Sequence, residues 1–227
     1  MNVNKTREAI LDNSIVIFNE KKATKVSTVQ IADFMGISPG NLYYYFRNKE
    51  EIIRCLWFER IRRELQNTIP KFSDLDSGEQ IVDLLMNMTE HIIAYKFFYQ
   101  EISTLINNDD ELRDAMKESK RNNDRALFRF IETLIGNGLI QSISMEEKIR
   151  LADAICCIVG KAFYSNYAYS FYYEMNGRMK KVFLTNMVMT ISPYLTEKCW
   201  DGIRNGLQTY DIDYHENAKI LEAQYIS

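Results

Sequence analysis

The sequence predicts an all-α protein, and three observations carry that prediction. The 227 residues include only 9 glycines and 3 prolines, well below average usage, so tight turns are few. Apolar residues recur at helical spacing along most of the chain, and no alternating run of useful length predicts a strand. Small polar residues that cap helices precede several of these runs, as Ser27, Ser38 and Asn48 do, and they mark where helices begin.

The apolar pattern places the first helix at residues 6–20 and divides the rest of the chain at polar turns. Ser27 with Gln30 forms a capping box that starts a second helix. Gly36 ends this helix near Met35 because glycine readily takes the left-handed conformation. Longer helices are expected at 78–107, 110–136, 145–173 and 178–192, followed by a polar tail after about Gln208.

Between these segments lies a short helix with strong start signals. Ser38 is its expected N-cap, and Pro39 is its first residue, where the missing N–H costs nothing. It spans about residues 39–46, because Asn48 and Glu51 then open a fourth helix that reaches almost to Pro70. The second helix, the turn at Gly36 and this short helix make a helix-turn-helix. Its expected interior is Ile31, Ala32, Ile37, Leu42 and Phe46.

The composition is that of an ordinary globular protein. Hydrophobic residues make up 46% and charged residues 26% of the chain, which excludes intrinsic disorder, a collagen-like chain and a membrane bundle. No window approaches the roughly 18 uncharged apolar residues of a membrane span. Charges such as Lys5 and Asp12 interrupt the amino-terminal stretch that a secretory signal would need to be apolar. We therefore expect a cytoplasmic protein with no membrane partner.

The cysteines and histidines show no pattern typical of a metal site. The four cysteines lack C-x-x-C spacing and predict reduced thiols. Adjacent Cys156 and Cys157 would point to different sides of a helix, so we interpret them as small buried residues. His91 and His215 lie far apart, with no ligand pattern beside them. We expect neither a metal nor another cofactor.

Residues 38–51 read Ser-Pro-Gly-Asn-Leu-Tyr-Tyr-Tyr-Phe-Arg-Asn-Lys-Glu-Glu. With the capped second helix, this segment resembles the DNA-binding domain of the TetR family of bacterial transcriptional regulators. The resemblance covers about residues 5–55. It implies an all-α fold in which an N-terminal three-helix helix-turn-helix domain, residues 1–50, is joined by a long helix of about residues 49–69 to a larger helical ligand-binding and dimerisation domain within 51–227.

The residues of the short helix fit DNA recognition physically. Gly40 has no Cβ, so the protein backbone can approach a base pair or a phosphate closely at this position. The Asn41 amide can form hydrogen bonds with a base edge or a phosphate. Three consecutive tyrosines cannot all be buried, so at least two must face outward. The resemblance implies DNA contacts at Thr28, Ser38, Gly40, Asn41, Tyr43, Tyr44, Tyr45 and Lys49. The sequence departs from the family at Lys22, where glycine is frequent, and at Tyr45, where histidine is frequent.

Charge is unevenly divided along the chain. Residues 1–66 carry eleven Lys/Arg against eight Asp/Glu, whereas residues 67–227 carry seventeen against twenty-three. A polyanion is therefore expected to bind the amino-terminal third. One short helix reads only a few base pairs, so we expect a homodimer on a palindromic double-stranded operator. The family implies that the last two long helices pair with their mates, although an intramolecular core would explain their apolar stripe equally well. That stripe comprises Ala152, Ile155, Val159, Ala162, Phe163, Val182, Leu184, Met187 and Ile191.

The middle of the chain is rich in aromatic residues and methionine, which can line an apolar cavity. In the family's usual arrangement this is the inducer pocket, and the effector would be small and apolar or amphipathic. The residues expected there are Met88, His91, Tyr95, Phe98, Tyr99, Arg125 and Phe128. Glu101 is a further possible polar contact for such a ligand. Polar residues of these types are more often ordinary surface or core residues than ligand contacts.

The function predicted from these observations is a ligand-responsive transcriptional repressor that a small effector releases from DNA. Activation in place of repression stays open. An alternative is an effector-independent architectural or cell-division factor on the same fold. An enzyme is not expected, since the chain shows no nucleophile elbow, zinc-protease motif, P-loop or dinucleotide fingerprint.

Overall fold

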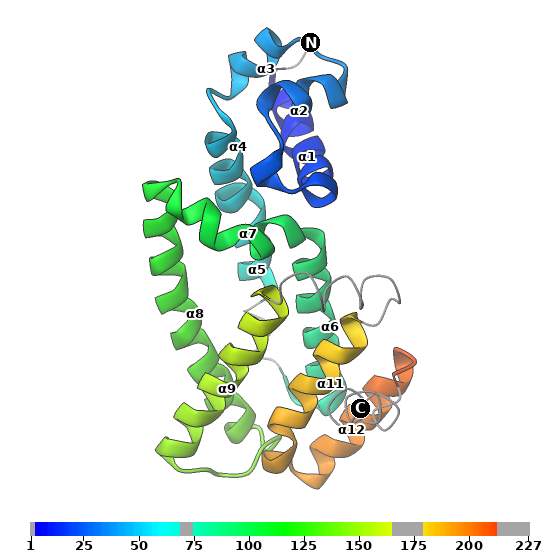
Figure 1. Ribbon diagram of the computed structural model, residues 1–227. Coiled ribbons are helices and arrows are strands. Elements are labelled where there is room, and N and C mark those ends of the chain that lie inside the picture. The colour runs from blue at the N-terminus through cyan, green and yellow to red at the C-terminus, as the bar shows by residue number, and fades with distance from the viewer. Residues whose placement is uncertain (1–2, 69–74, 165–178, 213–227) are drawn as a thin grey trace, which may run out of the picture. The chain divides into compact units, whose positions relative to one another are not determined.

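The computed structural model describes residues 3–68, 75–164 and 179–212, and these residues are helical apart from short connections (Figure 1). The all-α prediction is confirmed. Within the described ranges, the sole β-type pairing is an isolated bridge between Ile140 and Leu195. The α-helices are α1 (Val3–Lys21), α2 (Thr28–Met35), α3 (Pro39–Tyr45), α4 (Lys49–Leu56), α5 (Arg62–Thr68), α6 (Gly78–Ala94), α7 (Lys96–Asn107), α8 (Asp110–Gly136), α9 (Met145–Tyr164), α11 (Met179–Ile191) and α12 (Glu197–Thr209).

The chain forms two compact units. The amino-terminal unit comprises Met1–Gln66 and His91–Lys120, and the second unit comprises Asn67–Glu90 and Arg121–Ser227. The helix-turn-helix therefore shares its unit with α7 and the beginning of α8, which lie far away in the sequence. The functional boundary that the sequence places at residue 50 stays a prediction.

The expected helix caps of the amino-terminal unit are present. The Gln30 backbone N–H donates to Ser27 Oγ (3.3 Å), and the Ser27 N–H donates to Gln30 Oε1 (2.9 Å), which completes the capping box. Gly36 takes the left-handed conformation, with φ of 66°. Ser38 accepts from the Asn41 N–H (3.2 Å) and Asn48 from the Glu51 N–H (2.8 Å). These local contacts fix where α2, α3 and α4 begin.

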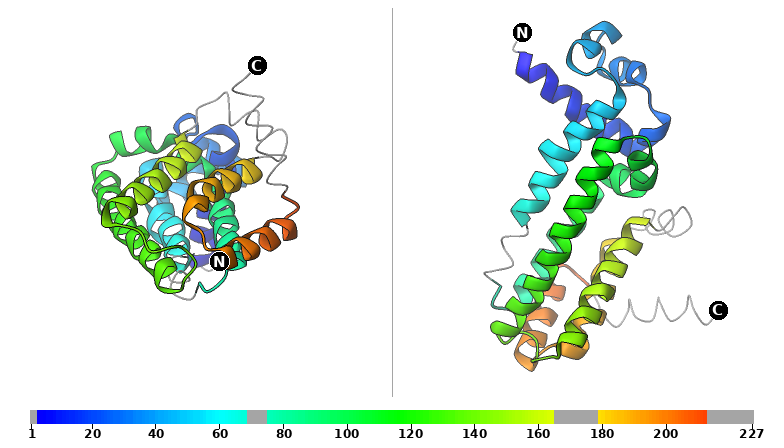
Figure 2. Two further views of the ribbon diagram at one scale, coloured as in Figure 1. Left: turned by 90° about the horizontal axis from the view of Figure 1, so that it is seen from below. Right: turned by 90° about the vertical axis from the view of Figure 1, so that its left-hand side faces the viewer.

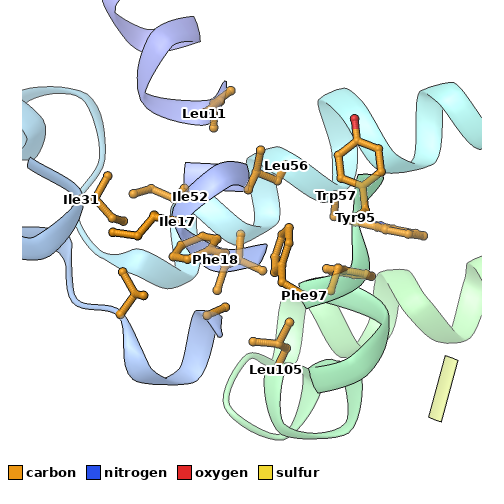
Figure 3. Packing of buried hydrophobic residues seen from close by; sticks show 14 of the residues in the cluster. Leu11, Ile17, Phe18, Ile31, Ile52, Leu56, Trp57, Tyr95, Phe97 and Leu105 are labelled. Atoms are coloured by element: carbon orange, nitrogen blue, oxygen red, sulfur yellow. The ribbon is translucent and has the colours of Figure 1, made fainter. Parts of the chain in front are cut away.

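Buried aliphatic and aromatic side chains form the core of the amino-terminal unit (Figure 3). The Phe18 ring of α1 lies against the Phe97 ring of α7, with centroids 5.2 Å apart. The Trp57 indole stacks on Phe98, with centroids 5.2 Å apart and planes inclined by 6°. Large aromatic pairs of this kind add to the free energy gained from burial alone. The core thus joins α7 to the helices of the helix-turn-helix.

The expected fourth helix is interrupted by a π-helical segment, η2 (Trp57–Ile61), between α4 and α5. Ion pairs attach this segment to α1. Arg7 donates to both carboxylate oxygens of Glu59, at 2.8 and 2.5 Å, and Arg60 pairs with Glu8. The bidentate contact from Arg7 keeps the pKa of the Glu59 carboxyl below its usual value.

The helix expected at 78–107 is broken at Tyr95 into α6 and α7. Asn19 of α1 satisfies backbone groups on both sides of the break. Its amide donates to the Ala94 carbonyl (2.8 Å), and its side-chain oxygen accepts from the Phe97 N–H (3.0 Å). The prediction of a continuous helix was wrong because the partner that stabilises the break lies 75 residues or more earlier in the chain.

In the second unit, α9 packs on α11, and α9 runs antiparallel to the carboxyl-terminal half of α8 (Figure 2). Lys148 pairs with Glu132 across that antiparallel pair (2.5 Å). Helix α12 was not expected, although Thr196 caps it by accepting from the Cys199 N–H (3.3 Å). Gly78 of α6 lies so close to α12 that a Cβ there would stand 2.1 Å from the Cys199 carbonyl oxygen.

The apolar stripe proposed for α9 and α11 is largely buried within the chain itself. Ile155, Leu184, Met187 and Ile191 are all buried, so the intramolecular core accounts for them. The side chains of Ala162 and Phe163 lie outside the part of the chain that the structure describes. The expectation that Cys156 and Cys157 are buried was wrong, since both are exposed on α9.

Candidate nucleic-acid interface

The helix-turn-helix is held together by small and apolar residues, as expected. Ile31 and Ala32 of α2 and Leu42 of α3 are fully buried, and Phe46 is nearly so. The Ile37 N–H donates to the Ala32 carbonyl (3.0 Å) across the turn. Buried on one side, α3 must present its remaining residues outward.

The tyrosines of α3 divide between surface and core. Tyr44 is 74% exposed and Tyr43 is 48% exposed. Tyr45 is partly buried against the core and meets the Tyr44 ring edge-on, with centroids 5.0 Å apart. At least two tyrosines therefore face outward, as predicted. Phenol rings placed this way can contact thymine methyl groups, and their hydroxyls can donate to phosphates.

Tyr43 is linked to the beginning of α2. The Tyr43 and Thr28 hydroxyl oxygens lie 2.8 Å apart and share a hydrogen bond. Both residues line a shallow, open hollow of about 420 Å³. Lys25 and Arg47 line the same hollow, although they were not among the residues expected to contact DNA. The basic bias of residues 1–66 is the signal that could have found them.

Lys49 lies at the first position of α4, where the sequence placed it, but its ammonium group forms hydrogen bonds with the protein's own backbone. Its Nζ donates to the Ala23 carbonyl (2.6 Å) and reaches the Thr24 carbonyl at 3.5 Å. Both acceptors belong to the 3₁₀ turn η1 (Ala23–Lys25). Lys49 thus holds the turn before α2 and still borders the hollow.

The remaining predicted DNA contacts lie at the amino end of α3. Ser38 and Gly40 are exposed, and Asn41 is partly exposed. A Cβ on Gly40 would meet no heavy atom within 4 Å, and its backbone needs no positive φ. Nothing within the described chain therefore requires glycine at this position.

Lys22, where the family frequently has glycine, lies in an unusual backbone conformation. Its φ is 71° and its ψ is 134°, a region that L-residues rarely adopt. Its N–H donates to the Phe18 carbonyl (2.9 Å) and ends α1. The chain then turns sharply into η1.

Four of the residues expected in a ligand pocket lie together in the amino-terminal unit. The His91 Nε2 and the Tyr99 hydroxyl are hydrogen-bonded (2.9 Å), and the Tyr95 hydroxyl donates to Glu64 (2.8 Å). Burial lowers the pKa of His91 and raises those of both tyrosines. Phe98 is fully buried on Trp57.

The other three expected pocket residues belong to the second unit. Arg125 is exposed, whereas Met88 and Phe128 are partly buried. Glu101, considered as a polar contact for a ligand, instead accepts hydrogen bonds from η1. The set of pocket residues stays a prediction.

The chain matches two families of known proteins. Residues 10–55 match the family described as bacterial regulatory proteins, tetR family, and residues 60–201 match the TetR family described as bacterial transcriptional repressor. The second match covers more than half of the chain. The chain belongs to the TetR family. It is a transcriptional regulator with a helix-turn-helix that binds DNA.

One curated relative of this TetR-family regulator has a distantly related sequence. A curated relative, the probable HTH-type transcriptional regulator YttP of Bacillus subtilis, is 25% identical over 111 residues, which cover 44% of this chain and 54% of that protein. The match thus spans about half the length of that relative.

Solved structures share the fold. A TetR-family regulator from Marinobacter aquaeolei VT8 has a TM-score of 0.74 and 23% identity, over 90% of this chain and 98% of the other. SmeT, described as the repressor of a Stenotrophomonas maltophilia multidrug efflux pump, was solved in complex with triclosan. That complex has a TM-score of 0.56 and 17% identity, over 85% of this chain and 93% of the other.

The described residues offer neither a membrane-spanning helix nor a metal-binding cluster. Among them, no helix has the length and apolar character required to cross a bilayer. Within the same residues, no group of three or more His, Cys, Asp or Glu side chains is arranged to hold a metal ion.

Proposed function

We propose that this TetR-family regulator is a cytoplasmic repressor without enzymatic activity, which binds a palindromic operator as a homodimer and is released by a small effector. The observation that carries the DNA part of the proposal is the outer face of α3. It combines an exposed Gly40 that the chain itself does not require with the linked hydroxyls of Tyr43 and Thr28. Glycine there leaves room for a duplex backbone or base edge.

The homodimer is supported by the small size of α3 and by an exposed face on α9. A seven-residue helix reads only a few base pairs, and a two-fold dimer doubles the site. Met145, Ile149 and Cys156 follow one another at spacings of four and seven, which places them on one side of α9. Met145 and Ile149 are 59% and 57% exposed. We assign this face, in place of the buried stripe, to the partner subunit.

Effector release is supported by the cluster of His91, Tyr95 and Tyr99, which combines aromatic surface with polar atoms. The SmeT–triclosan complex is a structure of the same fold with a small amphipathic ligand. We therefore propose an effector of that chemical class, contacting His91, Tyr95, Phe98 and Tyr99 of the amino-terminal unit.

The DNA proposal is tested at Gly40. The wild type is first used to enrich a duplex from a random pool, and its affinity for that duplex is then compared with that of G40A. An added methyl group meets no protein atom, so α3 should become more stable, by up to about 1 kcal/mol. Against DNA, the same methyl group should cost about 1–3 kcal/mol of binding free energy, as an overpacked contact does.

Gly136→Ala is the matched control. A Cβ on Gly136 also meets nothing within 4 Å, and this residue ends α8, outside the helix-turn-helix. G136A should bind the enriched duplex as the wild type does. The proposal fails if the wild type enriches no sequence, or if G40A binds the enriched duplex as tightly as G136A.

The effector proposal is tested with a panel of small amphipathic phenols, with triclosan as the first probe. An effector should raise the melting temperature and release the enriched duplex at the same concentration range. Ligands that stabilise the protein without releasing the duplex would contradict the proposed switch.

A further inference from the structure

The turn η1 is held by a side chain from a distant helix. Glu101 of α7 receives hydrogen bonds from the Ala23 N–H (2.6 Å), the Thr24 N–H (3.3 Å) and the Thr24 hydroxyl. Two consecutive backbone N–H groups and a hydroxyl thus converge on one carboxylate. This is the arrangement by which a backbone concavity binds an anion, and here the protein supplies the anion itself.

The opposite side of the same turn is held by Lys49. Its ammonium group donates to the Ala23 carbonyl (2.6 Å) and approaches the Thr24 carbonyl (3.5 Å). The donors of η1 therefore face a carboxylate from α7, and its acceptors face an ammonium from α4. Ala23, the first residue of η1, is fully buried between them.

The position of η1 determines where α2 begins. Only Val26 separates η1 from Ser27, the N-cap of α2, and Thr28 follows with its hydroxyl bonded to Tyr43. A three-residue 3₁₀ turn has little intrinsic stability of its own. Its place must therefore come from the side chains that hold it.

We propose that Glu101 is a positioning residue for operator binding, which fixes η1 and thereby the amino end of α2 against the DNA backbone. This inference rests on the proposed DNA-binding function. It assigns part of the DNA-binding apparatus to α7, outside the helix-turn-helix itself. It also predicts that the Glu101 carboxylate strengthens operator binding, whereas its negative charge alone would weaken binding to DNA.

The test is the affinity of E101A for two duplexes, the one enriched by the wild type and a scrambled duplex of the same length. Removing a negative charge from the DNA-binding unit should by itself strengthen binding to both, because DNA is a polyanion. Loss of positioning should instead weaken binding to the enriched duplex by about tenfold, as expected for lost hydrogen bonds to a charged group. The ratio of the affinity for the enriched duplex to that for the scrambled duplex should therefore fall. Lower stability alone would not change this ratio, because it reduces the amount of folded protein available to both duplexes equally.

Two milder variants keep the proposal testable if E101A does not fold. E101Q retains an oxygen that can accept from the Ala23 N–H, so its ratio should lie between those of E101A and the wild type. T24V removes only the hydroxyl donor and should lower the ratio less than E101A does. In the E101A background, T24V should add nothing, since its partner is gone.

Glu20→Ala is the matched charge control. Glu20 is exposed near the end of α1, in the same unit, and E20A should leave the ratio of affinities unchanged. The inference is overturned if E101A or E101Q binds the enriched duplex as tightly as E20A, or if T24V has an equal effect with and without Glu101. If the wild type enriches no duplex, the proposed function itself has failed.

Discussion

Replacing Lys22 by glycine should stabilise the protein, although it removes a long side chain from the surface turn after α1. Lys22 has φ of 71° and ψ of 134°. A residue with a Cβ in such a conformation stores about 1–3 kcal/mol of strain. The strain persists because the residues around it are fixed. Phe18 and Ala23 are fully buried, and Glu101 holds η1 directly after Lys22.

The net gain is smaller than the strain. Glycine gives the unfolded chain more freedom, which costs about 0.4–1 kcal/mol. The expected net change in the free energy of unfolding is therefore about 1 kcal/mol in favour of K22G. For a chain of this size, that corresponds to a rise of about 2–4 °C in melting temperature.

The comparison must separate the backbone from the side chain. K22A removes the same side-chain atoms beyond Cβ and keeps the strain, so the relevant quantity is the difference between K22G and K22A. Both are measured by thermal and denaturant unfolding at one protein concentration, because a homodimer's stability depends on concentration. Equal melting temperatures for K22G and K22A, or a lower one for K22G, would refute the argument that strain is stored at this position.

Three further predictions concern recognition, pH and assembly. Y43F removes the hydroxyl bonded to Thr28 and should weaken binding to the enriched duplex by about 1 kcal/mol in anisotropy titrations; unchanged affinity would exclude a role for that hydroxyl. His91 lies beside Tyr95 and Tyr99, and burial lowers its pKa although the nearby Glu64 carboxylate acts to raise it. Between this lowered pKa and the ordinary value of about 6.5, the unfolded state therefore binds more protons than the folded state does. Stability should therefore fall as the pH falls through about 6.5, and H91Q should reduce that slope in pH-dependent unfolding; an identical slope in H91Q would assign it to other groups. I149E places a charge on the exposed face of α9 and should prevent dimerisation, so that light scattering gives the 26.7 kDa mass of a single chain. A variant that dimerises with the affinity of the wild type would show that the interface lies elsewhere.

The sequence by itself determined the helix-turn-helix and its boundaries. The signals at Ser27, Gly36, Ser38 and Asn48 act through hydrogen bonds to residues within a few positions, so their effect can be foreseen without knowing the rest of the fold. The outward position of Tyr43 and Tyr44 followed in the same way, because burying Leu42 and Phe46 on one side of a short helix leaves the other side to solvent.

Other features depended on residues far away in the sequence. Asn19 stabilises the break between α6 and α7, Glu101 holds η1, and Gly78 permits the close approach of α12. The sequence assigned Glu101 to a possible ligand contact and Gly78 to the beginning of a helix, because the residues around each of them do not indicate which distant residues they contact. A cap is a local interaction and can be predicted from spacing, whereas a hydrogen bond across about 75 residues exists only once the helices have packed.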